Sequence, residues 1–385
     1  MRKIMELTVL SLSLLTVMAG AAISPALGEI AERFSSAERL LIQMVVSLPA
    51  LVIIPSLAFT NWITGYLSKR KVLLAGLIIY IAGGTGGGLS NSIYTLLFFR
   101  ALLGIGVGMV MPFSTALISD LFEGEERARL MGLSSSSNML GGMVALLFSG
   151  FLASVSWRLP FAIYFFAVPV FLMNFRYLPD PPERTSQVVK DRLSPRVYWL
   201  ALAMFLLNLT FYVLPLTMAL FIKEQSLGSP GICGLAIAFS TAGGVLAGLC
   251  FQKIRELTGP YHVPVMLALM TAGFLLLHYS YVIVTVFLGT AFIGFANRSI
   301  YPLVFLRATS GIDRTQSVRI TATLSGMIYL GQFISPLFIS SMGHLFGNTS
   351  LRFNYLMMGM IIFTGLLGSL GYIFLFSSDG KKETS

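Results

Sequence analysis

The stretch at residues 96–112, "LLFFRALLGIGVGMVMP", decides the class of this protein, because it is apolar enough to cross a membrane and yet contains an arginine. Fifteen of its seventeen residues are apolar or glycine. A guanidinium in the middle of a bilayer costs at least about 2.5–3.5 kcal/mol. Arg100 must therefore face protein or a polar cavity rather than lipid, and some role has to offset its cost.

The composition of the whole chain agrees with a membrane protein. Of its 385 residues 56% are hydrophobic and only 11% are charged, whereas about 25% of a soluble domain is charged. About 20 apolar residues cross a bilayer, and each isolated span has to be a helix to satisfy its own backbone. We predict an all-α polytopic membrane protein with twelve spans near 6–27, 40–61, 72–90, 94–117, 131–153, 159–177, 198–222, 231–251, 263–281, 282–304, 320–341 and 353–376. The N-terminal run has the form of a secretory signal, but we interpret it as the first span because it has a counterpart later in the chain.

The distribution of lysine and arginine predicts the orientation. With the N-terminus in the cytoplasm, 19 of the 26 basic residues fall in cytoplasmic segments and five in outer loops, and Arg100 and Arg298 remain inside spans. Cytoplasmic loops are enriched in basic residues, so we predict that both termini are cytoplasmic. The same placement explains the net charge of +10 without a nucleic-acid partner.

The sequence pattern predicts two related halves. We predict a six-helix bundle at 1–177, a polar cytoplasmic linker at 178–197, a second six-helix bundle at 198–377 and a cytoplasmic tail at 378–385. A shift of 190 residues aligns five pairs, namely Pro25 with Pro215, Gly104 with Gly294, Pro112 with Pro302, Arg129 with Arg319, and Gly141 with Gly331. Parallel repeats of this kind occur in transporters, whose substrate binds between the halves. Pro25 and Pro215 predict matching bends in the first and seventh spans.

Several motifs resemble the major facilitator superfamily, in particular its twelve-span drug:proton antiporter branch. Arg100, Gly104 and Gly106 match the R-x-x-x-G-x-G pattern of span 4, and "DLFEGEERARLMGL" (120–133), "WRLPF" (157–161) and "GQFISP" (331–336) are similar to family segments. The resemblance covers nearly the whole chain. It implies the two-bundle fold and transport by alternating access. Span 5 departs from the antiporter branch, because Ala145 and Leu146 replace its Gly-Pro pair.

The resemblance also implies a cytoplasmic gate. The family loop after span 2 corresponds to "NWITGYLSKRK" (61–71), where Asn61 replaces a glycine and Gly65 replaces the acid. Lys69 and Arg70 keep the basic pair, with Asp120 as the implied partner and Arg127 nearby in the next motif. The loss of the acid at position 65 is expected to weaken the latch between the halves.

The two arginines inside spans each allow two interpretations. Arg100 binds an anionic or polar group in a cavity or tunes a proton site, or it bonds backbone carbonyls and organises the first bundle. Arg298, near Asn297 and Tyr301, binds substrate or a counter-ion, or it reaches the inner interface or a carbonyl. No acid lies in the middle of a predicted span, and this asymmetry hints at an anionic or zwitterionic substrate.

Other polar residues are candidates for the cavity or for bonds between helices. They are Asn138, Asn208, Tyr212, Tyr301 and Gln332. A proton-coupled transporter commonly needs a titratable group in its cavity. Glu29, Asp120 and Glu6 are the acids nearest to such a position, and Asp120 already has an implied structural partner.

We therefore expect a secondary transporter of the plasma membrane that exports small amphipathic or drug-like molecules in exchange for protons. The alternatives are a transporter for an organic anion or metabolite without proton antiport, and a receptor-like protein that keeps the fold without transport. We expect no enzymatic activity, cofactor, metal site or nucleic-acid partner. The expected partners are a small-molecule substrate, protons and the lipid bilayer, and the expected state is a monomer.

Overall fold

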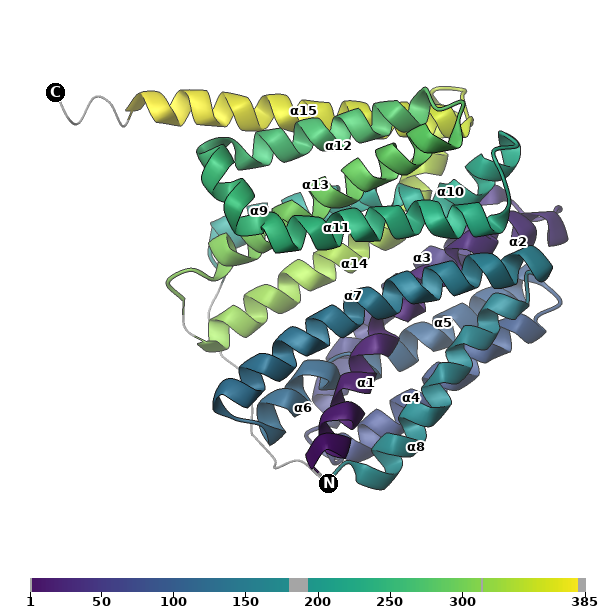
Figure 1. The fold of residues 1–385 in the computed structure, drawn as a ribbon, viewed down its shortest axis with the longest axis vertical. Coiled ribbons are helices and arrows are strands. Elements are labelled where there is room, and N and C mark those ends of the chain that lie inside the picture. The colour runs from purple at the N-terminus through teal and green to yellow at the C-terminus, as the bar shows by residue number, and fades with distance from the viewer. Residues whose placement is uncertain (1, 180–192, 313, 380–385) are drawn as a thin grey trace. The chain divides into compact units, whose positions relative to one another are not determined.

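The computed structural model describes residues 2–179, 193–312 and 314–379, which form helices joined by short turns, with no strand in these ranges (Figure 1). The predicted all-α class is confirmed. The predicted linker at 178–197 and tail at 378–385 lie mostly outside the described residues.

Ten helical segments in the described part of the chain are long and apolar enough to cross a membrane. One of them, Pro230–His278, is 49 residues long and contains the eighth and ninth predicted spans as α11 (Pro230–Thr258) and α12 (His262–His278). The first predicted span corresponds to α1 (Arg2–Ala21), which is not among the ten. The architecture is therefore consistent with the twelve predicted spans.

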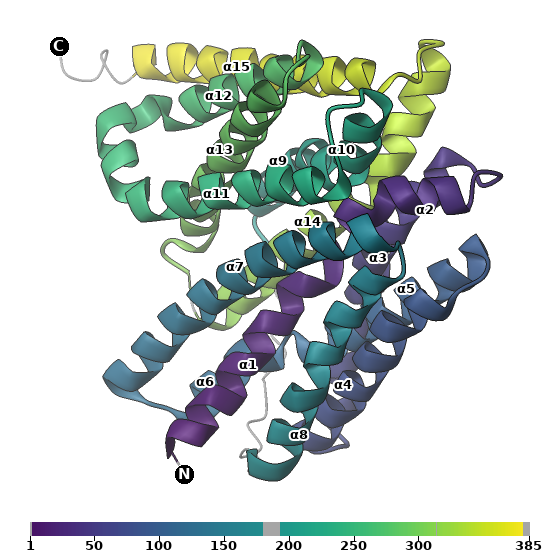
Figure 2. The same ribbon diagram turned by 45° about the vertical axis from the view of Figure 1, so that its right-hand side comes forward.

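The chain folds into two compact units, each of which is discontinuous in sequence. The first unit comprises Met1–Arg192, Pro215–Leu235 and Gln332–Leu337, and the second comprises Leu193–Leu214, Ala236–Gly331 and Phe338–Ser385. Further helices of the first unit are α2 (Leu27–Arg33), α3 (Arg39–Ile63), α4 (Lys69–Gly86), α5 (Ile93–Val110), α6 (Phe113–Leu121), α7 (Gly124–Val155), the 3₁₀ helix η3 (Leu159–Phe166), α8 (Ala167–Tyr177) and most of α10 (Val213–Glu224). In the first unit α1 packs between α7 and α8 (Figure 2).

The glycines of "GIGVG" allow α5 to pack closely on two helices at once. A Cβ at Gly104 would lie 2.8 Å from the Pro49 carbonyl oxygen of α3, and one at Gly106 would lie 2.5 Å from the Tyr80 nitrogen of α4. Gly108 contacts α3, like Gly104, since a Cβ at Gly108 would lie 2.5 Å from Ser56 Cβ. Any side chain at these positions would push the helices apart, so the glycines determine the packing of α3, α4 and α5.

The glycine run at the end of α4 and in the 3₁₀ helix η2 (Gly87–Leu89) that follows it receives two aromatic rings. A Cβ at Gly84 would lie 2.4 Å from the Tyr164 ring, and one at Gly87 would lie 2.4 Å from the Phe161 ring. Both rings come from η3, which forms the first eight residues of the helical span predicted at 159–177. The span is confirmed at Leu159–Tyr177, and its first part, Leu159–Phe166, is a 3₁₀ helix rather than an α-helix. In a 3₁₀ helix residues three apart lie directly in line, which brings both rings onto the same glycine surface.

Helix breaks occur near three of the prolines that relate the halves. Pro25 lies in a 3₁₀ turn (Ser24–Ala26) between α1 and α2, and Pro215 lies in the first turn of α10 after α9 (Pro195–Phe211) ends. Pro112 separates α5 from α6, whereas its repeat partner Pro302 lies inside the continuous α13 (Ile283–Thr309). The repeat therefore conserves the bends of the first and seventh spans but not that of the fourth.

The second unit contains α9, α12, α13, α15 (Leu351–Asp379) and most of α11 and α14 (Arg314–Leu345). Its helix α12 packs against both α13 and α15. A Cβ at Gly294 of α13 would lie 1.9 Å from the Ser240 carbonyl oxygen of α11, so these two backbones touch. Gly273 of α12 and Gly289 of α13 meet in the same way, each Cβ position falling within 2.9 Å of the other residue's carbonyl oxygen.

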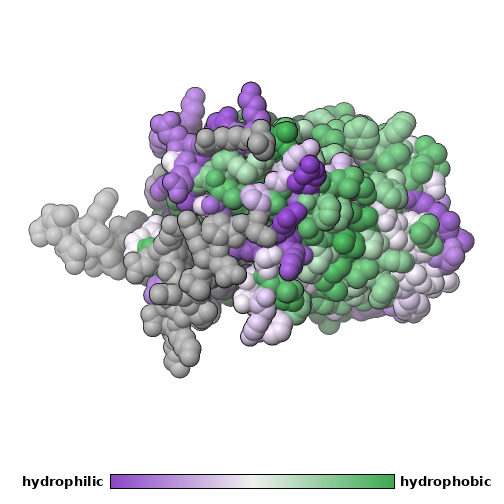
Figure 3. Space-filling view, turned by 90° about the horizontal axis from the view of Figure 1, so that it is seen from below, coloured by the Kyte–Doolittle hydropathy of each residue, from purple (hydrophilic) through white to green (hydrophobic). Residues whose placement is uncertain are grey.

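Large apolar side chains lie on the surface of the membrane helices. Phe148 and Phe151 of α7 are 60% and 67% exposed, and Leu249 of α11 is 79% exposed. On the face in Figure 3 apolar residues form a continuous area, with hydrophilic residues gathered toward its two ends. An exposed apolar surface of this kind suits contact with lipid chains rather than water.

Candidate functional site

Arg100 is fully buried in the first unit and is held by two neighbouring elements. Its Nε donates to the Val45 carbonyl oxygen of α3 at 2.6 Å, and its Nη1 donates to the Tyr164 hydroxyl of η3 at 2.8 Å. The guanidinium also lies 5.9 Å from the centre of the Tyr164 ring. These contacts are the ones expected if Arg100 has a structural role, because they connect α5 to α3 and to η3.

A second tyrosine extends this network. Tyr80 of α4 packs edge-to-face on Tyr164 and donates from its hydroxyl to the Leu15 carbonyl oxygen at 3.0 Å. Both tyrosines are at most 1% exposed. The pair connects α1, α4 and η3 around Arg100, and a buried polar group at membrane depth needs such partners.

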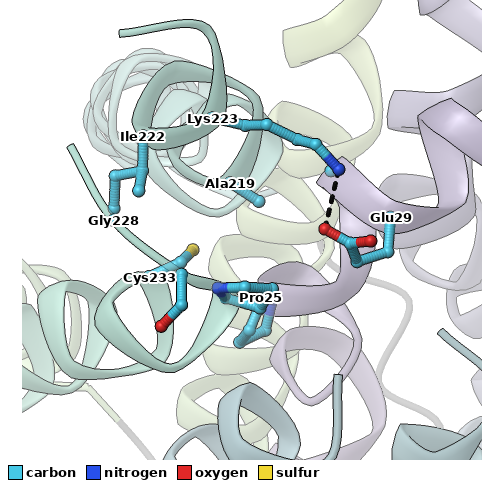
Figure 4. A pocket seen from close by; sticks show the side chains of 10 residues that line it. Pro25, Glu29, Ala219, Ile222, Lys223, Gly228 and Cys233 are labelled. Carbon is cyan, nitrogen blue, oxygen red and sulfur yellow. Dashed lines mark hydrogen bonds and ion pairs between the residues drawn. The ribbon is translucent and has the colours of Figure 1, made fainter. Parts of the chain in front are cut away.

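Glu29 of α2 belongs to a charge cluster with α10. Lys223 Nζ lies 2.7 Å from a carboxylate oxygen of Glu29 and 2.7 Å from one of Glu32 (Figure 4). The side chains of Glu29 and Lys223 are about one third exposed, and that of Glu32 is 65% exposed. Coulomb attraction is strongly screened at such positions, so each ion pair contributes no more than about 1 kcal/mol.

A small pocket of about 80 Å³ adjoins this cluster. It is lined by Pro25, Gly28, Glu29, Ala219, Ile222, Lys223, Gly228, Ser229, Pro230 and Cys233. Gly28 lets α2 approach α10, since its Cβ would lie 3.3 Å from the Ala219 carbonyl oxygen. Arg39 and Glu224 add a further ion pair at 2.7 Å between α3 and α10. The end of the first span is thus joined to the end of the seventh by charges that water can reach.

Arg298, Tyr301 and Asn208 come together in the second unit. The Tyr301 hydroxyl donates to Asn208 Oδ1 at 2.6 Å, which links α13 to α9. Arg298 is exposed, and its guanidinium lies 5.2 Å from the centre of the Tyr301 ring. It is also near enough to interact electrostatically with the Tyr329 hydroxyl of α14.

Four of the predicted gate residues lie at the junction of α3 and α4, whereas Asp120 lies in α6 and Arg127 in α7. Lys69 Nζ lies 2.6 Å from Asp120 Oδ2, while Arg70 donates to the Phe175 carbonyl oxygen of α8 instead of to Asp120. Asn61 and Gly65 are exposed. The Arg127 side chain makes no hydrogen bond or ion pair with any residue that the structure describes.

The remaining candidates are divided between the two units. Asn138 of α7 accepts a hydrogen bond from Thr16 of α1 at 2.8 Å, which is a bond between helices. Tyr212 is buried at the end of α9 in the second unit, whereas Gln332 groups with the first. Glu6 pairs with Arg129 at 2.6 Å. The structure therefore brings together Asn208, Arg298 and Tyr301 within the second unit.

The sequence does not single out Lys223, Glu32, Tyr164 or Tyr329 as partners of the candidates. A signal exists for Lys223, because it is one of only five basic residues in the predicted outer loops. No comparable signal marks the tyrosines, which lie in apolar spans. Nowhere in the described ranges do three or more His, Cys, Asp or Glu side chains gather in a way that could hold a metal ion.

Curated relatives match only parts of this chain. The multidrug transporter protein MdtP of Bacillus subtilis is 35% identical over 98 residues, which cover 25% of this chain and 18% of that protein. The quinolone resistance protein NorA of Staphylococcus aureus is 27% identical over 147 residues, which cover 37% of each chain. The matches thus span about a fifth to two fifths of the length of these relatives.

Solved transporter structures match nearly the whole fold. The nucleoside transporter NupG has a TM-score of 0.81 at 11% identity, with 95% of this chain and 99% of that chain covered. A bacterial homologue of the lysosomal transporter Spinster, inward-facing and unoccupied, has a TM-score of 0.76 at 16% identity, with 97% and 96% covered. At these identities the likeness concerns the fold alone.

The family itself follows from the sequence match. The family model described as Major Facilitator Superfamily matches residues 9–336, which is most of the chain. This match agrees with the helical architecture and with the transporter structures that share it. The chain belongs to the major facilitator superfamily of membrane transporters.

Proposed function

We propose that this protein exports small amphipathic, drug-like molecules across the plasma membrane in exchange for protons. The names of its partial relatives, a multidrug transporter and a quinolone resistance protein, support export of such molecules. We further propose that both termini are cytoplasmic and that the bundles at 1–177 and 198–377 alternate access to a central site. The proposed monomer needs no cofactor.

The observation that carries this proposal is the charge cluster at the ends of the first and seventh spans. Glu29 and Glu32 hold Lys223 through contacts of 2.7 Å, next to helix breaks at Pro25 and before Pro215. In the proposed orientation this end faces outward. Partly exposed ion pairs can open at small free-energy cost, as an alternating-access gate requires.

Glu29 is the proposed coupling residue. A proton that binds its carboxylate from outside removes the negative charge that attracts the Lys223 ammonium. The outer ends of the two spans then separate more easily, so that protons from outside favour release of the exported molecule. Glu32, which is more exposed, assists as a second partner of the same lysine.

The test is transport of 2-naphthalenesulfonate, a small amphipathic molecule, by the full chain in proteoliposomes with and without an imposed pH gradient. We expect the gradient to drive transport of this probe by the parent, and Glu29→Gln to abolish that dependence while substrate exchange without a gradient continues. Glu38→Gln is the matched control, because Glu38 is exposed and makes no ion pair within the described ranges. Transport by the parent that ignores the gradient would refute proton coupling, and full dependence in Glu29→Gln would refute the role of Glu29.

A second candidate function is transport of an organic anion or small metabolite without proton antiport. One observation favours it: in the described helices no Asp or Glu lies well inside a predicted span, whereas Arg100 and Arg298 each lie six residues inside one. Proton-coupled transport commonly uses an embedded titratable group. Uptake of an anionic probe that is unaffected by the pH gradient would select this candidate over the first.

A further inference from the structure

Arg298 occupies an unusual position in the second unit. It lies sixteen residues after the start of the predicted span 282–304 and six before its end, or about 24 Å and 9 Å along the helix. The backbone of Arg298 therefore lies inside the span, in the third that is cytoplasmic in the proposed orientation.

The neighbours of α13 leave little of this helix for lipid. It packs on α12 through Gly289, on α11 through Gly294 and on α9 through Tyr301 (Figure 1 and Figure 2). The Arg298 stem itself lies against α11, where a Cβ at Gly244 would meet Arg298 Cγ at 2.6 Å. Gly244 thus makes room for the arginine between the two helices.

Within the described ranges nothing neutralises this arginine. Arg298 makes no ion pair there, and its guanidinium instead faces the Tyr301 ring. A cation–π contact stabilises a cation by about 0.5–2 kcal/mol but carries no opposite charge. The cost of an unpaired guanidinium at membrane depth, at least about 2.5–3.5 kcal/mol, is larger.

The charge balance of the second unit also indicates that Arg298 lacks a counter-ion. Among its described side chains Glu256 is the only acid, whereas seven are basic, namely Arg196, Lys253, Arg255, Arg298, Arg307, Arg319 and Arg352. No acidic side chain of this unit in the described part of the chain can serve as a counter-ion at the depth of Arg298. An anion that enters the site would supply the missing charge.

We propose that Arg298 binds the anionic group of the transported molecule, a carboxylate, sulfonate or phosphate on an amphipathic body. The Tyr301 ring and the stem of Arg298 offer an apolar surface to that body, and the bond from Tyr301 to Asn208 holds the ring in place. Guanidinium pairs planar carboxylates through two parallel hydrogen bonds, which a lysine cannot reproduce. The inference rests on the proposed transport function and names its substrate class.

The test is a binding measurement with three probes that share one naphthalene body. The probes are 2-naphthoate, the neutral 2-naphthamide and the cationic 2-naphthylmethylammonium, each titrated against the full chain in lipid nanodiscs. We expect the parent to bind naphthoate most tightly. Hydrogen bonds to charged groups contribute enough that Arg298→Gln should weaken naphthoate binding by roughly 10- to 100-fold and amide binding by less than about threefold.

Two further variants separate binding from folding. Arg298→Lys keeps the charge and should retain part of the preference for naphthoate, and Arg255→Gln removes an exposed arginine of the same unit and should change nothing. Equal binding of naphthoate and naphthamide by the parent would overturn the proposal, as would an unchanged preference in a folded Arg298→Gln. The binding measurement uses no pH gradient, so it can confirm this site even if export is not driven by protons. Likewise, proton-driven export can be confirmed even if Arg298 does not bind an anion.

Discussion

Replacement of Arg100 by methionine tests whether this arginine stabilises the first unit. The substitution keeps an unbranched side chain but removes the donors to the Val45 carbonyl oxygen at 2.6 Å and the Tyr164 hydroxyl at 2.8 Å. It also removes the cation above the Tyr164 ring. A structural arginine should therefore leave a less stable but otherwise unchanged protein.

The magnitude follows from these two hydrogen bonds. A bond to a charged group contributes about 1.5–3 kcal/mol in proteins generally. Side-chain bonds inside membrane proteins average only about 0.6 kcal/mol, because the unfolded chain in the membrane also finds partners. Since Arg100 is fully buried and loses both bonds, we expect Arg100→Met to lower the free energy of unfolding by about 1–6 kcal/mol. Tyr164→Phe removes one of the bonds and should lower it by about 0.6–3 kcal/mol.

The assay is unfolding of the full chain in mixed micelles of increasing dodecyl sulfate content, followed by tryptophan fluorescence. Trp157 is a suitable reporter for the first unit because it packs on Phe34 and Phe161. The double variant should reveal a coupling of about 0.5–3 kcal/mol between Arg100 and Tyr164. Arg176→Met, which removes an exposed arginine, is the control.

Two results would refute the reasoning. If Arg100→Met unfolds at the same dodecyl sulfate content as the Arg176→Met control, the two hydrogen bonds add nothing to stability. If the double-variant coupling is zero, Arg100 and Tyr164 act independently and the short distance between them has no energetic meaning. Either result would favour the other interpretation, in which Arg100 faces a cavity and binds a polar group. Loss of probe binding by a stable Arg100→Met variant would then support that interpretation.

Two further predictions concern glycines. Gly294→Ala should destabilise the protein by about 1–3 kcal/mol or more, because the new methyl group would overlap the Ser240 carbonyl oxygen at 1.9 Å. Gly248→Ala is the control, because a Cβ there meets nothing within 4 Å. Equal unfolding curves for the two variants would contradict this packing argument. Gly65→Asp restores the family acid at an exposed position and should increase the outward-facing population in distance distributions between spin labels on the two bundles; unchanged distributions would show that the latch argument does not apply to this chain.

Much of the fold is predictable from the sequence because hydropathy is a property of each residue and its immediate neighbours. The all-α class needs only apolar runs long enough to cross a bilayer. The expected joint between the ninth and tenth spans falls where the structure ends α12 at His278 and begins α13 at Ile283. The 3₁₀ geometry of Leu159–Phe166 was not predictable, because it depends on the glycines of α4 and η2 that receive Tyr164 and Phe161.

The candidate site was predictable by residue type but not by partner. A polar or charged residue in an apolar run stands out by itself, so Arg100, Arg298 and Asn208 could be named from the sequence. What each one touches depends on the depth and rotation of helices far away in the chain. The Arg298 cluster needs α9 beside α13, with 93 positions between Asn208 and Tyr301.

The sequence by itself determined that this is a helical membrane transporter of a duplicated, twelve-span family, since length, hydropathy and local motifs suffice for that. Only the tertiary structure decided that Arg100 is buried on Tyr164, 64 positions away, while Glu29 is joined to Lys223, 194 positions away. The physical reason is that a buried charge is stabilised by whichever polar group the packing brings within hydrogen-bond distance. Helix packing is a property of the assembled bundle, and no local pattern encodes it.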